Sequence, residues 1–177
     1  MPVTLQLASL NQRYILQNIW PAYMHDLSQY QTHKPNDHGL LDEAGIKSYS
    51  DENFMTAWTD YPEDVFVFFI RVEESLAGIG LVVSSALAKC DADKLLHDFF
   101  VFRYYRGKGI AQSAATQIFD WFKGSWQLEV LSKNLPALSF WRKVIDAYSD
   151  EYKEDAQDSD GEQLIGFTFS SPSTGTL

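Results

Sequence analysis

The chain has little cysteine and no long hydrophobic run. Its single cysteine, Cys90, cannot form an internal disulfide, which fits a reducing compartment. No segment approaches the roughly 20 apolar residues of a membrane span, and the first residues lack the basic and apolar regions of a signal peptide. We therefore expect a cytoplasmic protein that has no membrane partner.

Basic residues are also scarce. The 14 Lys and Arg side chains are outnumbered by 24 Asp and Glu, which gives a formal net charge of −10. A nucleic-acid-binding protein needs a basic stripe that neutralises phosphates, so no nucleic-acid partner is expected here. An acidic surface instead favours a cationic acceptor. Against this background the cluster of Arg103, Arg106 and Lys108 stands out.

The hydrophobic content suits one folded domain. Of the 177 residues, 45% are hydrophobic and 15% are aromatic, which is enough to fill a single core. No internal repeat and no linker divides the chain. We expect one domain over residues 1–170, followed by a C-terminal tail over residues 171–177.

Hydrophobic periodicity predicts alternating helices and strands. The first helix should be kinked or split by Pro21. This order predicts a mixed α/β (α+β) protein with a mostly antiparallel central sheet flanked by helices. The expected strands are residues 3–7, 65–72, 77–83, 95–102, 126–131, 148–154 and 163–169. The expected helices are residues 10–27, 51–59, 109–122 and 135–145. The main expected loops are residues 30–45, 84–94 and 154–162.

The most informative segment is Tyr105-Arg106-Gly107-Lys108-Gly109-Ile110-Ala111, which joins a predicted strand to a predicted helix. Successive N–H groups converge in such a turn, and the first turn of a helix adds unsatisfied donors and the positive end of its dipole. Glycine lets an anion approach the backbone and adopts φ values that are costly for other residues. The segment therefore predicts a pyrophosphate site, with an ordinary glycine-containing connection as the alternative, and its spacing matches neither GxGxxG nor a P-loop.

A second segment, Asn134-Leu135-Pro136-Ala137-Leu138-Ser139-Phe140-Trp141, begins the next predicted helix. In this order the two segments resemble motifs A and B of the GNAT superfamily of acyl-CoA N-acyltransferases. Within that superfamily the chain is similar to an uncharacterised bacterial branch of predicted acetyltransferases, through residues 23–28, 98–101 and 140–145. The resemblance implies the GNAT fold, in which the central sheet is splayed at the CoA site.

The resemblance also implies where acyl-CoA lies. The cofactor would sit between two strands that separate, the one ending at Phe102 and the one over residues 126–131. Backbone groups near Phe99, Phe100 and Val101 would pair with the pantetheine arm as an added strand does. The other cofactor-binding residues implied are Arg106, Gly107, Lys108, Gly109, Ile110 and Ala111 at the pyrophosphate, and Asn134, Ala137, Phe140 and Trp141 along the arm.

The implied reaction is direct attack of a primary amine on acetyl-CoA, with no metal. The acceptor would be a small molecule or a peptide. The ammonium must lose a proton, the oxyanion must meet an N–H donor near Phe100 or Val101, and the thiolate must leave. We expect Asp98 to be the base, with a solvated carboxylate or a fixed hydrogen-bond partner as the alternative reading. Asp26 and Glu129 are weaker candidates.

Residues of the first helix are expected to line the acceptor pocket. Tyr23 and Tyr30 would offer aromatic faces to a cation, and Asp26 would lie beside them. Solvation of a helix surface explains Asp26 equally well.

The residue at the general-acid position differs from the one that is usual in the family. Trp141 occupies the position where many members have a tyrosine, and an indole is only a weak N–H donor. Tyr148 or Tyr105 would then be the acid, unless the thiolate leaves unassisted. The alternative function is a catalytically impaired acyl-CoA-binding sensor or subunit.

Other reactive side chains predict no further site. Cys90 is not a candidate nucleophile, because direct transfer needs no covalent intermediate. His97 and Asp98 resemble a metal pair, but adjacent strand residues point to opposite faces, so they are not expected to share an ion. A homodimer through the C-terminal strands fits the sequence without being required by it. Three further histidines lack zinc-site spacing and are expected at the surface: His25, His33 and His38.

Overall fold

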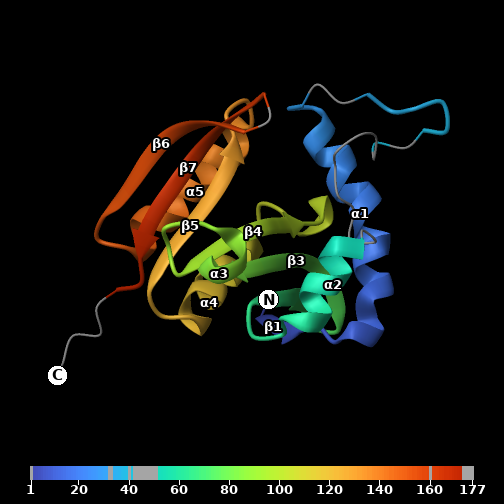
Figure 1. Ribbon diagram of the computed structural model, residues 1–177, viewed down its shortest axis with the longest axis horizontal. Coiled ribbons are helices and arrows are strands. Elements are labelled where there is room, and N and C mark those ends of the chain that lie inside the picture. The colour runs from blue at the N-terminus through green and yellow to red at the C-terminus, as the bar shows by residue number, and fades with distance from the viewer. Residues whose placement is uncertain (1, 32–33, 40, 42–51, 160, 173–177) are drawn as a thin grey trace.

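The computed structural model describes residues 2–31, 34–39, 41, 52–159 and 161–172. Its strands form one seven-stranded sheet in the order β1-β2-β3-β4-β5-β7-β6 (Figure 1). Neighbouring strands are antiparallel except β4 and β5, which are parallel, so the predicted fold class is confirmed. The strands are β1 (Val3–Leu7), β2 (Val65–Val72), β3 (Ser75–Ser84), β4 (Lys94–Val101), β5 (Ser125–Leu131), β6 (Tyr152–Ser159) and β7 (Glu162–Ser170).

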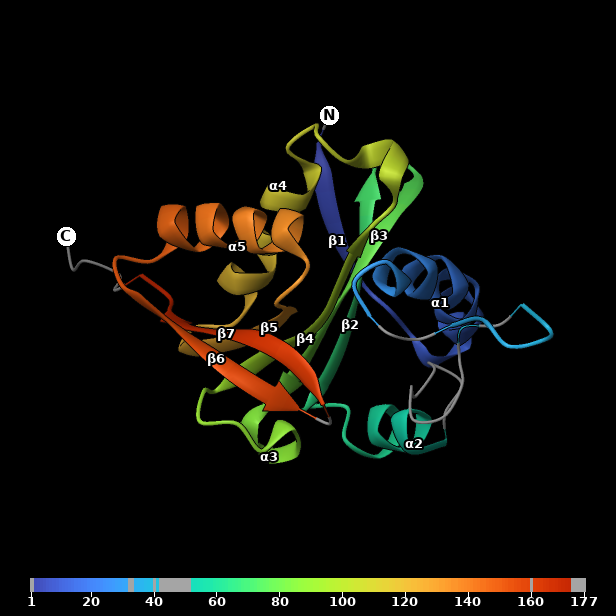
Figure 2. The same cartoon turned by 90° about the horizontal axis from the view of Figure 1, so that it is seen from above.

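Helices cover both faces of this sheet. One face carries α1 and α2, and the other carries α4 and α5 (Figure 2). No helix in the described ranges is both long and apolar enough to cross a bilayer. The helices are α1 (Arg13–Ser28), α2 (Glu52–Asp60), α3 (Ser85–Ala88), α4 (Ile110–Trp121) and α5 (Leu135–Tyr148), with 3-10 turns at Leu10–Gln12 and Arg103–Tyr105.

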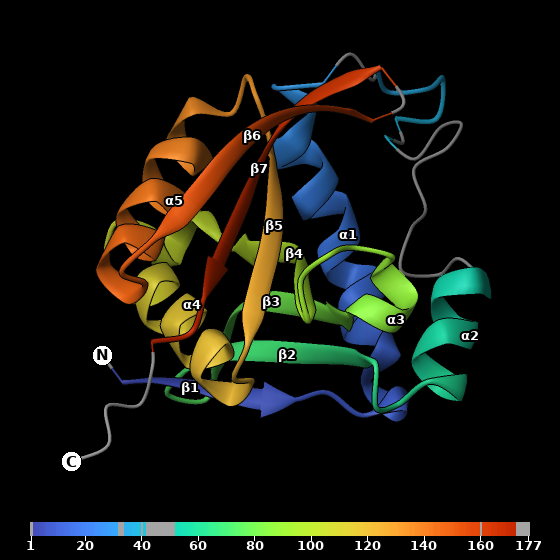
Figure 3. The same cartoon turned by 60° about the vertical axis from the view of Figure 1, so that its left-hand side comes forward.

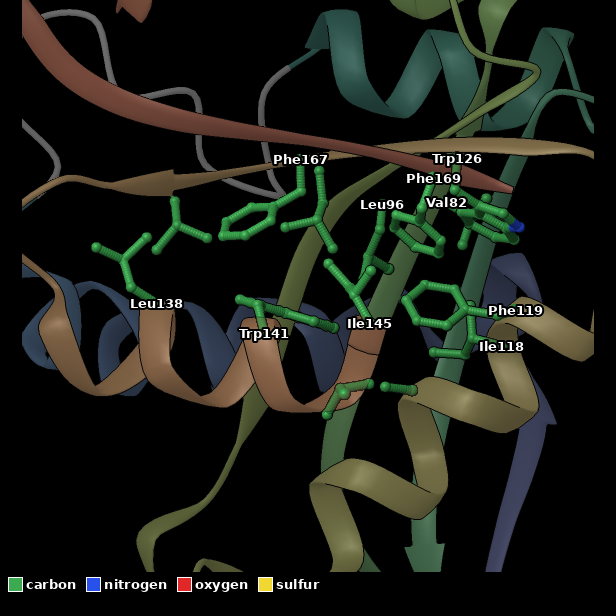
Figure 4. Packing of buried hydrophobic residues seen from close by; sticks show 14 of the residues in the cluster. Val82, Leu96, Ile118, Phe119, Trp126, Leu138, Trp141, Ile145, Phe167 and Phe169 are labelled. Atoms are coloured by element: carbon green, nitrogen blue, oxygen red, sulfur yellow. The ribbon is translucent and has the colours of Figure 1, made fainter. Parts of the chain in front are cut away.

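The alternation of strand side chains divides the core into two layers. Along β2, Phe68 packs with the α4 and α5 side, whereas Val67 and Phe69 pack with the α1 side. In the α4 and α5 layer, Phe119 and Ile145 point from their helices toward the sheet (Figure 4). Burial of these large side chains fixes both helices against the strands that form the site described below.

Several predicted elements differ from the structure. Of the kink or split predicted at Pro21, the split does not occur, because α1 continues through this residue. The loop over residues 84–94 contains the short helix α3. The strand expected at residues 148–154 was wrong, because α5 extends to Tyr148 and the strand β6 begins at Tyr152. The loop expected at residues 154–162 was also wrong, because β6 continues to Ser159 and β7 begins at Glu162. Most β6 side chains are exposed on both faces of the strand, so the sequence of β6 shows no apolar alternation. The strand is recognised only by its pairing with β7.

Several sequence predictions concern residues outside the described ranges. They include His33, part of the predicted loop over residues 30–45, and residues 173–177 of the predicted tail.

Candidate active site

The two central strands, β4 and β5, pair over only three residues. Their parallel ladder joins Lys94–Leu96 to Trp126–Leu128 and then stops, although β4 continues to Val101 and β5 to Leu131. Beyond this point the sheet divides, and β5, β7 and β6 run at a steep angle to β2 and β3 (Figure 3). We call residues 93–96 with 125–128 the closed end, and residues 97–101 with 129–131 the open end.

The closed end is fastened by side-chain hydrogen bonds. The Ser125 N–H and hydroxyl each donate to Asp93 Oδ2 at 2.8 Å, and the Asp93 N–H donates to Ser125 Oγ at 2.9 Å. These bonds from Ser125 lower the pKa of the Asp93 carboxyl. Gly124 has a φ of 126°, and an added Cβ there would lie 2.5 Å from Asp93 Oδ2. The turn before β5 therefore requires glycine.

The open end begins with a β-bulge in β4. Val82 pairs with Leu96 and Leu81 pairs with Asp98, so His97 is an extra residue. Leu96 and Phe99 both pack with the α5 side, which leaves His97 and Asp98 together on the α1 face. His97 Nδ1 lies 3.0 Å from Asp98 Oδ2. The expectation that these two side chains point to opposite faces was therefore wrong, because the bulge interrupts the alternation.

Backbone groups of β4 are exposed to the open end. The Phe102 N–H donates to Ala77 O at 2.9 Å, so it faces β3. Because N–H and C=O directions alternate along a strand, Phe100 also faces β3, and Phe99 and Val101 face the gap. The prediction that Phe100 pairs with an added strand is thus corrected: its backbone groups belong to the ladder with Ile79.

The glycine turn after β4 presents a row of unused donors. Gly107 and Gly109 have φ values of 73° and 76°, and Gly109 is the N-cap of α4. The first helical bond runs from the Ser113 N–H to Gly109 O at 3.0 Å. Among the described residues, the six N–H groups of residues 107–112 have no hydrogen-bond acceptor. With the helix dipole behind them, they form a concave site suited to an anion.

Space also remains in front of these glycines. A Cβ added at Gly107 or Gly109 would meet no heavy atom within 4 Å. Internal packing therefore does not explain either glycine, whereas positive φ and close approach of a ligand do. Beside the turn, Lys108 Nζ lies 4.2 Å from the centre of the Tyr104 ring.

The Arg106 side chain turns away from this row of donors. Its Nε donates to Val101 O at 2.7 Å, its guanidinium pairs with Asp26, and its Cζ lies 5.7 Å from the centre of the Phe100 ring. Arg103 pairs with the same carboxylate at 2.9 Å. Arg106 was predicted at the pyrophosphate, but only its backbone adjoins the turn. Asp26, predicted to face the acceptor, is already neutralised by two arginines.

A hydrogen-bonded set joins α1 to the bulge. The Tyr23 hydroxyl donates to Asp98 Oδ1 at 2.9 Å, and its ring packs on Phe100 with centroids 5.5 Å apart. Burial, with the Asp98 carboxylate, raises the pKa of the Tyr23 phenol well above its ordinary value. The charge of Asp98 also raises the pKa of His97. Sequence reasoning missed the placement of His97 beside Asp98, because only the spacing of Leu96 and Phe99 on one face signals the bulge.

The start of α5 forms the other wall of the gap. Asn134 caps the helix, because its Oδ1 accepts from the Ala137 N–H at 3.1 Å. Phe140 stacks on Phe99 with centroids 6.2 Å and planes 17° apart, and the Trp141 ring lies 5.2 Å from Phe99. Phe140 and Trp141 thus lie beside Phe99 of β4. Trp141 is buried and points from α5 toward the sheet (Figure 4).

The remaining predicted residues are dispersed. Tyr148 lies in the last turn of α5, about 20 Å along the helix from Leu135, and its hydroxyl donates to Asp120 at 3.1 Å. The guess that Tyr148 is the general acid is therefore not supported by its position. Tyr105, the other guess, packs against the cluster that contains Ile110. Tyr30 lines a small hollow with residues 131–133 and 161–163, at the open end of β5.

The described residues form no cluster of metal ligands, and their larger surface hollow lies away from the gap. No group of three or more His, Cys, Asp or Glu side chains in these ranges is arranged to hold a metal. A larger surface hollow lies between β1 and α4, away from the gap, and is lined by Thr4, Leu5, Gln117, Asp120 and Trp121.

Comparison with models of known protein families identifies the family of this chain. A model of the acetyltransferase (GNAT) family matches residues 20–146, which is more than half of the chain. The chain belongs to the GNAT family. This membership confirms the resemblance seen in motifs A and B. No protein with a curated description matches the sequence.

Solved structures of GNAT proteins share the fold. An acetyltransferase from Thermus thermophilus has a TM-score of 0.64 at 11% identity, covering 96% of this chain and 97% of that one. The PaiA N-acetyltransferase of Thermoplasma acidophilum, solved with coenzyme A, has a TM-score of 0.61 at 13% identity, with coverages of 94% and 98%. A SpeG spermidine N-acetyltransferase chimera from Vibrio cholerae and hSSAT has a TM-score of 0.57 at 11% identity, with coverages of 96% and 96%. These identities are low, so the likeness concerns the fold.

Proposed function

We propose that this GNAT protein transfers an acetyl group from acetyl-CoA directly to a primary amine of a small molecule or peptide. The observation that carries the proposal is the row of six N–H groups at residues 107–112, next to a strand edge on which the Phe99 N–H and C=O and the Val101 N–H face the gap. A diphosphate matches the first feature and a pantetheine arm, with its amides, matches the second. Relatives of the same fold solved with coenzyme A support the assignment.

Residues of the open end would have distinct tasks. Phe99 offers an N–H and a C=O to the arm, and the Val101 N–H would donate to the oxygen on which negative charge develops. Phe140 and Trp141 would exclude water from the α5 side through their contact with Phe99. Acetyl-CoA supplies the activated acyl group, and the chain supplies binding, orientation and proton transfer.

The acceptor would enter from the α1 side. Tyr23 and Tyr30 lie on that side, Tyr30 in the hollow beside the end of β5. A cationic amine suits a protein with a net charge of −10, and one neighbour of the same fold is a spermidine N-acetyltransferase. We therefore propose amines, including polyamines, as the acceptor class, and a cytoplasmic location.

Thermal unfolding with coenzyme A tests the binding step. A ligand at 100 times its Kd stabilises the folded state by about 2.7 kcal/mol, so millimolar coenzyme A should raise Tm by several degrees. Thiol release from acetyl-CoA with a panel of amines then tests the transfer. Absence of stabilisation by coenzyme A would contradict the proposal. Stabilisation without thiol release for any amine would instead favour the alternative, an acyl-CoA-binding sensor that lacks the usual tyrosine at position 141.

A further inference from the structure

The bulge in β4 places an imidazole where the two central strands separate. His97 follows Leu96, the last residue of β4 in the parallel ladder. Its side chain is 56% exposed, whereas that of Asp98 is 13% exposed. Of this pair, His97 is therefore the side chain that a molecule entering the open end can reach.

Asp98 is occupied on both oxygens. Oδ1 accepts the Tyr23 hydroxyl at 2.9 Å, and Oδ2 lies 3.0 Å from His97 Nδ1. A carboxylate held in this way orients its partners and is poorly placed to accept a further proton from a substrate. This arrangement fits the reading of Asp98 as a fixed hydrogen-bond partner rather than the base itself.

The same contacts define the chemistry of His97. A carboxylate only accepts hydrogen bonds, so Nδ1 carries the hydrogen and Nε2 of the neutral ring is left as an acceptor. Among the described residues, no hydrogen bond reaches Nε2. A histidine held by a carboxylate at Nδ1, with Nε2 open to the reactant, is the arrangement that general-base catalysis uses in other enzymes.

The charged and titratable groups around the ring favour its protonation. Asp98 is the largest influence on the pKa of His97 and raises it, and Glu129 of β5 acts in the same direction, while burial opposes them. Tyr23 faces Asp98 from α1 and remains a neutral donor, because its pKa is raised. Arg106 lies over the neighbouring Phe100 ring, with its charge paired to Asp26.

We infer that His97 is the general base of the proposed acetyl transfer, with Asp98 and Tyr23 as positioning residues. This inference rests on the proposed function. The acceptor ammonium loses two protons in all. The first passes to His97 Nε2 and then to solvent; the amine nitrogen bonds to the acyl carbon as the carbon–sulfur bond breaks; and the second proton ends on the departing thiolate.

The test compares matched variants with acetyl-CoA and spermidine, or the best amine of the panel. His97→Gln should lower kcat by about 10²- to 10⁴-fold and leave the Kd of coenzyme A unchanged. In the wild type, log kcat/KM should rise with pH to a plateau with an inflection at the His97 pKa. Asp98→Asn should move that inflection to lower pH, because it removes the charge that raises the pKa. His25→Gln, an exposed histidine on α1, should behave as the wild type.

Two outcomes separate this inference from the proposed function. If the wild type is active and His97→Gln keeps its rate and pH profile, the base is not His97 but the acetyl transfer stands. If no amine is acetylated, NMR titration of the histidine ring still tests the arrangement without a substrate. It should show the Nδ1–H tautomer and a higher pKa in the wild type than in Asp98→Asn. An Nε2–H tautomer, or equal pKa values, would overturn the inference.

Discussion

The closed and open ends of the β4/β5 gap are formed by the same two strands in different ways. At the closed end a parallel ladder and the Asp93–Ser125 hydrogen bonds satisfy the backbone. At the open end one inserted residue, His97, ends the alternation, and the ladder between β4 and β5 stops at Leu96. A single bulge thus converts a sheet interior into two edges, and an edge is what an extended ligand can pair with.

The largest expected effect comes from removing the support that both ends share. Phe119 of α4 packs against Trp126 at the closed end, with centroids 5.0 Å apart, and against Trp141 beside the open end, at 6.2 Å. Because this side chain is fully buried, Phe119→Ala should reduce the free energy of unfolding by about 3–5 kcal/mol. Urea denaturation measures the loss. Trp121→Ala, at a position 53% exposed, is the control and should cost clearly less; equal losses would contradict this reading of the core.

The next effect concerns ligand binding beside the open end. Gly109→Ala should strain the backbone by about 1–2 kcal/mol, because φ is 76°, and place a methyl group in the space before the N–H row. We expect the Kd of coenzyme A to rise at least about tenfold, as measured by calorimetry.

Gly161→Ala is the matched control. Its φ is 82°, and an added Cβ there also meets nothing within 4 Å. Both variants should lose similar stability, but only Gly109→Ala should lose affinity for coenzyme A. Equal affinities would show that the turn does not bind it.

The contrast between the two ends was only partly predictable from sequence. The glycine turn and the helix start at Asn134 could be found from the sequence, because each has a local residue signature. The separation of the two strands was only implied by the resemblance to the GNAT superfamily. The bulge at His97 has no such signature, since it depends on how β4 pairs with β3. The direction of Arg106 likewise depends on Asp26, which lies 80 residues away in the chain. Tyr148 was misplaced because α5 continues one turn beyond its apolar pattern.

A smaller effect is expected from the ion pairs on the α1 side of the open end. Asp26→Asn removes the partner of Arg103 and Arg106, whose side chains are 67% and 43% exposed. Exposed pairs contribute about 0.2–1 kcal/mol, so the loss of stability should be of that size and should shrink in high salt. Thermal unfolding at low and high salt checks this. A loss that does not depend on salt would indicate that Asp26 acts through packing rather than charge.

The smallest effect should be an opposite pH response of the two ends. The pKa of Asp93 is lowered, so its contribution to stability is present above the ordinary value near 3.9 and is lost as pH falls through the folded pKa. The pKa of His97 is raised, so its contribution is present below about 6.5 and is lost as pH rises through the folded pKa.

Two variants isolate these responses. The difference in unfolding free energy between wild type and Asp93→Asn should shrink on acidification below about pH 4. The difference between wild type and His97→Gln should shrink as pH rises above about 6.5, through the folded pKa of His97. Denaturation at a series of pH values measures both. Differences that stay constant over these ranges would show that neither contact contributes through its charge.

The most direct measurement is an amide NMR titration with coenzyme A. The N–H signals of residues 107–112, together with those of Phe99 and Val101, should shift in a saturable way, and those of Asp93 and Ser125 at the closed end should move little. If millimolar coenzyme A leaves the first set unchanged, the open end does not hold the cofactor and the proposed transferase site is wrong.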